Sequence, residues 1–81
     1  MRKTKIRVTR QDIREGKQEG RYSCPIAIAM KRTIGLRCRV GCKEASVPHF
    51  GPLSLPRKAA EFVNTFDYFG AKRVKPFEFY I

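Results

Sequence analysis

Lysines and arginines recur at alternate positions of two short segments, a spacing that is suited to binding phosphate groups. They are Lys3, Lys5 and Arg7 in the first segment and Arg37 and Arg39 in the second. Because alternate residues of a β-strand point to the same side, each segment would present its cations on one face. A lysine meets a phosphate as a point charge and an arginine as a fork of donors. If both strands share an open sheet face, the sequence predicts a basic plate that binds nucleic acid, with Tyr80 of the last strand beside it.

The alternative for this plate is an ordinary solvated face on which Glu78 is the partner of the cations. No acidic residue intervenes among the cations of either strand, which favours the binding interpretation. The plate lacks the paired aromatic residues with which RNA-recognition sheets stack bases. We therefore expect phosphate contacts with limited sequence preference.

A second anion site is predicted where Arg21, Tyr22 and Ser23 precede an apolar segment. Ser23 is a suitable N-cap and Pro25 suits the first helical turn, so a helix would begin here. Its free backbone N–H groups and the positive end of its dipole could hold a phosphate or a nucleotide, and Tyr22 could stack on a base. The alternative is capping by Ser23, with Tyr22 packed as a hydrophobic staple.

Three cysteines and the single histidine could supply four zinc ligands. These residues are Cys24, Cys38, Cys42 and His49. No C-x2-C pair is present and Cys38 has the inward parity of its strand, so no metal site is predicted, and a small zinc-dependent structural module is the alternative. Cys24, at a helix start, could have a lowered pKa and be reactive, yet no base lies near it in the sequence. Catalytic motifs such as a phosphate loop or a nucleophile elbow are also missing, so we expect no enzyme and no cofactor.

The charge balance points to a polyanionic partner. Eighteen Lys/Arg against seven Asp/Glu give a net charge of +11, above the ~2–8 that serves solubility in a small domain. Residues 1–21 carry eight basic and three acidic side chains, against five and three in residues 56–81. Nucleic acid or a nucleotide is therefore the expected partner, and a host protein is the alternative. An odd cysteine count and the lack of a leader or membrane-spanning pattern predict a cytoplasmic protein that does not enter a membrane.

Strands and helices alternate along the chain and must position these residues. Residues 26–29 are all Ile or Ala, so the central helix must be covered nearly all round. The expected elements are a strand at 4–9, a short helix at 10–15, a loop at 16–22, a helix at 24–34, strands at 36–40 and 44–50, a turn at Gly51-Pro52, a helix from Pro56 to Gly70 and a strand at 74–81. This β-α-β-β-α-β order, with an extra short helix after the first strand, predicts one α+β domain over residues 1–81. Its layers would form a two-layer sandwich, most simply with ferredoxin-like topology.

Three short motifs resemble a family of small bacteriophage and prophage proteins without an assigned activity. They are Cys24-Pro25-Ile26-Ala27 with Ala29 and Arg32, then Leu55-Pro56 with Ala59, Phe62, Phe66 and Asp67, then Pro76-Phe77 with Phe79. The resemblance implies a compact, phage-encoded protein in the host cytoplasm, and it carries no catalytic residue over. Because such genes often serve host takeover or counter-defence, the alternative function is anti-defence. The protein would then sequester an anionic nucleotide signal or block a host effector protein.

Overall fold

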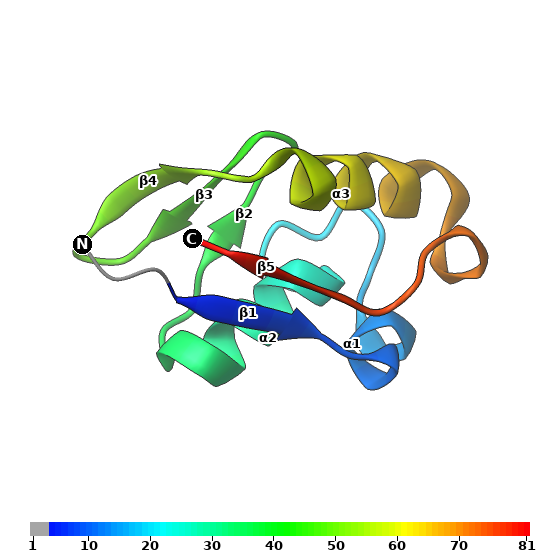
Figure 1. Ribbon diagram of the computed structural model, residues 1–81, viewed down its shortest axis with the longest axis horizontal. Coiled ribbons are helices and arrows are strands. Elements are labelled where there is room, and N and C mark those ends of the chain that lie inside the picture. The colour runs from blue at the N-terminus through cyan, green and yellow to red at the C-terminus, as the bar shows by residue number, and fades with distance from the viewer. Residues whose placement is uncertain (1–3) are drawn as a thin grey trace.

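The computed structural model describes residues 4–81, in which three α-helices and five strands form an α+β fold with two antiparallel sheets (Figure 1). The predicted fold class is therefore confirmed. Lys3 lies outside the described residues. Among residues 4–81, every helix is too short or too polar to cross a lipid bilayer.

The first half of the chain forms one strand and two helices. Strand β1 (Lys5–Val8) leads into α1 (Arg10–Glu15), where Thr9 and Asp12 form a reciprocal capping box. Helix α2 (Pro25–Ile34) ends at Gly35 in the left-handed conformation (φ 85°), as expected for a glycine C-cap. Its apolar first turns are buried, as the sequence predicts for a helix that must be covered.

The middle of the chain forms a three-stranded sheet from β2 (Arg39–Val40), β3 (Glu44–Val47) and β4 (Gly51–Ser54). The predicted turn at Gly51-Pro52 is wrong, because β4 begins there and pairs with β3. Pro52 has no N–H to donate, which an edge strand tolerates. The chain instead turns at residues 48–50, where His49 adopts a positive φ of 72°. The strands expected at 36–40 and 44–50 are correspondingly shorter.

The last third carries α3 (Arg57–Phe69), a 3₁₀ turn η1 (Ala71–Arg73) and β5 (Phe77–Tyr80). Strand β5 returns antiparallel to β1, with Arg7 opposite Glu78. The β1–β5 pair lies between α3 on one side and α1 with α2 on the other (Figure 1). The Phe62 and Phe77 rings, 4.8 Å apart, join α3 to β5.

The core is formed by the inward faces of both sheets together with α2 and α3. Its largest fully buried side chains include Phe79, Ile6, Ile26 and Met30. A ferredoxin-like topology joins its strands in a single sheet, whereas the described strands form a pair, β1–β5, and a separate meander, β2–β3–β4. The single sheet that a ferredoxin-like topology requires is not found among the described strands, so this topology is not confirmed. This division of the sheet determines where the predicted site residues lie.

Candidate functional site

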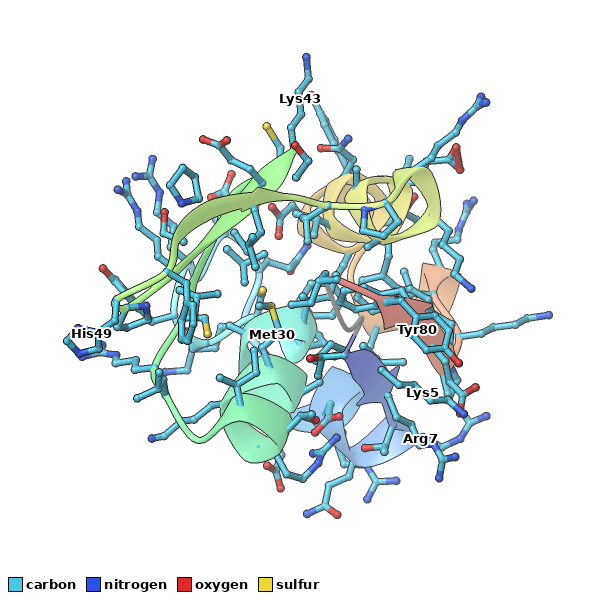
Figure 2. All side chains as sticks on the ribbon, turned by 60° about the vertical axis from the view of Figure 1, so that its left-hand side comes forward. Lys5, Arg7, Met30, Lys43, His49 and Tyr80 are labelled. Atoms are coloured by element: carbon cyan, nitrogen blue, oxygen red, sulfur yellow. The ribbon has the colours of Figure 1, made fainter. Side chains whose placement is uncertain are left out.

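The cations of β1 share a carboxylate on the neighbouring strand. Lys5 Nζ lies 3.2 Å from Glu78 Oε1, and Arg7 Nε donates to Glu78 Oε2 at 2.8 Å. The hydrogen bond from Arg7, followed by that from Lys5, holds the pKa of Glu78 below its ordinary value. Figure 2 shows Lys5, Arg7 and Tyr80 on one side of the molecule. This surface is basic, but Glu78 cancels one of its two charges, as the alternative interpretation of the sequence predicts.

The cations of the second segment lie with the other sheet. Arg39 is exposed on β2, opposite Ser46 of β3, and Arg37 is exposed just before β2. No strand pairing joins β2 to β1 within residues 4–81. The prediction that Arg7 and Arg37 share one sheet face is therefore wrong. Whether two strands belong to one sheet depends on pairing between distant segments. The alternation of residues within each strand does not reveal that pairing.

The structure brings the second segment together with the predicted anion site instead. The backbone N–H of Val40 donates to the carbonyl of Arg21 at 2.7 Å, which holds residues 21–22 beside β2. The Arg37 guanidinium carbon lies 4.3 Å from the centroid of the Tyr22 ring, a cation–π contact. Tyr22 remains 48% exposed, so it is not buried as a hydrophobic staple.

A cleft of about 760 Å³ opens between the loop at residues 19–24, the β2–β3 turn and α3. Arg21, Arg39 and Lys43 line it together with three carboxylate residues, Glu19, Glu44 and Asp67. Asp67 Oδ1 accepts a hydrogen bond of 2.9 Å from the backbone N–H of Glu19. We refer to the following residues as the Arg21 cluster: Arg21, Tyr22, Arg37, Arg39 and Lys43.

The cations of the Arg21 cluster have no acidic partner in the described part of the chain. The ion pairs within residues 4–81 involve Lys5, Arg7, Arg32 and Arg57. All four cluster cations are exposed. The cluster can therefore offer guanidinium and ammonium groups to an anion without first breaking an ion pair. Sequence reasoning missed Lys43, which belongs to no alternating pattern and is placed by the turn between β2 and β3.

The start of α2 differs from the predicted anion site. The N-cap is Cys24, whose Sγ accepts from the backbone N–H of Ala27 at 3.4 Å, and Ser23 lies in the preceding turn. Burial raises the pKa of the Cys24 thiol, and the negative charge of Asp67 adds to the rise. The sequence-based expectation of a lowered pKa at this position is therefore wrong, because the thiol is buried. One helical N–H that an anion would need is already used by the thiol.

The four residues of the zinc alternative do not assemble. Cys24 and Cys38 are buried and Cys42 is exposed. The Cys38 thiol donates to the carbonyl of Leu36 at 3.3 Å, and His49 lies at the outer edge of the molecule (Figure 2). Within residues 4–81, no group of three or more His, Cys, Asp or Glu residues is arranged to hold a metal ion.

No family model matches the chain, and no curated protein or solved structure matches it either. The resemblance to phage proteins therefore stays a prediction.

Proposed function

We propose that this protein binds nucleic acid through the Arg21 cluster and catalyses no reaction. The observation that carries the proposal is the placement of exposed, unpaired cations beside Tyr22, whose ring is covered on one side by Arg37. Guanidinium groups suit phosphate oxygens as forks, and a guanidinium stacked on a tyrosine extends a flat surface on which a base can lie. The net charge of +11 adds long-range attraction to a polyanion.

Lys5 and Arg7 have a secondary role in this proposal. Their shared partner Glu78 leaves one positive charge on the β1–β5 surface, which can attract a phosphate backbone more weakly than the Arg21 cluster does. We expect four phosphate contacts from the cluster. Such a number gives a slope of about −3 to −4 for the logarithm of the binding constant against the logarithm of salt concentration.

Fluorescence anisotropy with labelled oligonucleotides at about 50 and about 200 mM salt tests the proposal. Arg39→Ala should weaken binding and reduce the salt slope by about one, because one phosphate contact is lost. Lys31→Ala is the matched control, since Lys31 is an exposed cation in the last turn of α2 that forms no ion pair within residues 4–81 and lies outside the cluster. The absence of binding at the lower salt concentration would refute the proposal, and so would equal losses in both variants.

A second candidate function is the capture of a small anionic nucleotide in the cleft, the role expected of an anti-defence protein. The cleft volume of about 760 Å³ favours it, because small-molecule sites span roughly 300–1,000 Å³. The three carboxylate residues in the same cleft oppose it, and they lower the positive potential around Arg21, Arg39 and Lys43 as well. A rise in melting temperature with micromolar cyclic oligonucleotide, without binding of longer oligonucleotides, would favour capture over nucleic-acid binding.

A further inference from the structure

The last turn of α3 carries two aromatic side chains in solvent. Tyr68 is 83% exposed and Phe69 59% exposed, and their ring centroids are 6.2 Å apart. Phe62 and Phe66 of the same helix are buried. Phe69 follows Phe66 by three residues and continues this apolar side of the helix, but the core does not extend to cover it. Two neighbouring exposed rings differ from the singly scattered apolar residues of an ordinary protein surface.

Two cations follow these rings in the 3₁₀ turn η1. The Arg73 guanidinium carbon lies 5.0 Å from the centroid of the Phe69 ring, and Lys72 is exposed on the same 3₁₀ turn. Neither cation forms an ion pair with a carboxylate of residues 4–81. We refer to Tyr68, Phe69, Lys72 and Arg73 as the Tyr68 platform. Its combination of flat rings and unpaired cations is complementary to bases joined by phosphates.

A short segment of backbone connects the Tyr68 platform with the Arg21 cluster. At one end Gln18 Nε2 donates a hydrogen bond of 3.0 Å to the carbonyl of Asp67, the residue before Tyr68. At the other end Arg21 accepts the hydrogen bond from Val40. Both cation–π pairs found within residues 4–81 lie near this segment: Tyr22, which contacts Arg37, follows Arg21 in the chain, and Phe69, which contacts Arg73, lies two residues after Asp67.

We propose that the Tyr68 platform stacks the bases of single-stranded nucleic acid while the Arg21 cluster holds its phosphates. This inference rests on the proposed function and specifies its ligand. In a duplex the base faces are stacked on one another, so exposed rings on a protein surface cannot reach them without unpairing. In a single strand each base offers a free face, and stacking on an aromatic ring tolerates any sequence.

The test compares labelled oligo-dT and oligo-U of about 20 nucleotides with a duplex of the same length, by anisotropy at about 50 mM salt. Tyr68→Ala should weaken single-strand binding about five- to 150-fold, the range for one lost stacking contact. The salt slope should stay unchanged, because stacking releases no counterions. Duplex binding should also stay unchanged.

Two matched variants separate stacking from other effects. Tyr68→Phe should keep the affinity, because the ring remains. Phe50→Ala removes another strongly exposed ring (73%), next to His49 at the outer edge shown in Figure 2, and should have no effect. The chain has three tyrosines and no tryptophan, so tyrosine emission reports directly on stacking. Single-stranded oligonucleotides should quench it, and Tyr68→Phe should remove part of that quenching.

The outcomes distinguish this inference from the proposed function. If Tyr68→Ala binds single strands like the unmodified protein while Arg39→Ala binds them weakly, the platform is wrong and the Arg21 cluster stands. If no oligonucleotide binds at low salt, both fail. If sedimentation shows that Tyr68→Ala abolishes a dimer and leaves oligonucleotide binding unchanged, the rings serve contact between copies and the inference is overturned.

Discussion

Arg32 holds the buried carboxylate of Asp12 with two parallel hydrogen bonds, Nη1 to Oδ1 at 2.6 Å and Nη2 to Oδ2 at 2.8 Å. Its Nη2 also donates to the carbonyl of Arg7 on β1 at 2.8 Å. Asp12 closes the capping box of α1 with Thr9. One guanidinium group thus joins α2 to α1 and to β1, so Arg32 has a structural role beyond its favourable position at the C-terminal end of a helix dipole.

We predict that Arg32→Ala lowers the free energy of unfolding by about 2–3 kcal/mol. Asp12 would remain buried with its capping bonds but without its charged partner. The expected loss is smaller than for a fully buried ion pair, because the Arg32 side chain is 48% exposed and its charge is partly screened by solvent. Urea unfolding measures the change. Lys31→Ala is the control and should change the free energy by less than about 0.5 kcal/mol; equal losses would contradict the assigned role.

Stability should fall in acid, and Asp12 should account for part of the fall. Burial raises the pKa of Asp12, but the hydrogen bonds from Arg32 and Thr9 outweigh it, and the net pKa is below the ordinary value. A carboxylate with a lowered folded-state pKa stabilises the protein above its unfolded pKa of about 3.9. That contribution is lost as pH falls through the folded-state pKa.

Unfolding of the protein and of Asp12→Asn between about pH 7 and pH 2.5 tests this dependence. Asp12→Asn should be less stable at neutral pH, and the difference should shrink as the pH falls below about 4. Glu78→Gln, measured in the same way, gives the part of the acid sensitivity due to the β1–β5 surface, because the pKa of Glu78 is lowered too. A difference that stays constant to the lowest pH would show that the charge of Asp12 does not stabilise the fold.

Local sequence signals account for the helices and for the α+β class. Pro25 and Gly35 mark the ends of α2 through rules that involve only neighbouring residues. The end at Gly35 is confirmed, whereas the predicted N-cap Ser23 is wrong, because the helix begins at Pro25 and Cys24 is its N-cap. The division into two sheets could not be predicted, because strand pairing joins distant residues. Arg7 and Glu78 are an example: 71 positions separate them, and only the register of β1 with β5 makes them partners.

The candidate site was predictable in part. The sequence singles out Tyr22 by its place before a predicted helix and Arg37 by its place in an alternating strand. Their contact depends on the loop that the Val40 hydrogen bond holds beside β2. The exposed Phe69 gives no sequence signal, because its spacing from Phe66 is that of a core position. Tertiary packing decides where the core ends and which apolar residues are left in solvent.

The three thiols should differ strongly in reactivity. Cys42 is exposed, whereas burial raises the pKa of Cys24 and of Cys38. The thiolate is the reacting form of a cysteine. A disulfide reagent at about pH 8 should therefore modify Cys42 rapidly, and Cys24 and Cys38 only as fast as the protein unfolds. Cys42→Ser should remove the fast phase. A fast phase that persists in this variant would mean that Cys24 or Cys38 is accessible.

Glu19 is one of the three carboxylate residues that line the cleft beside the Arg21 cluster. Glu19 has a positive φ of 58°, which asparagine tolerates better than glutamate. Glu19→Asn keeps the backbone N–H that donates to Asp67 and removes a charge that repels phosphate. The variant should bind oligonucleotides about two- to fivefold more tightly at about 50 mM salt, with a smaller gain at higher salt because the effect is electrostatic.

The same variant should unfold with a free energy up to about 1 kcal/mol higher, since backbone strain is relieved. Glu15→Gln is the control for binding: it removes the same charge from α1, where Glu15 accepts a hydrogen bond from Gln11. If the gain in affinity comes from the local field around Arg21, Glu15→Gln should show little of it. An equal gain in both variants would mean that net charge alone governs binding, and the Arg21 cluster would lose its special role.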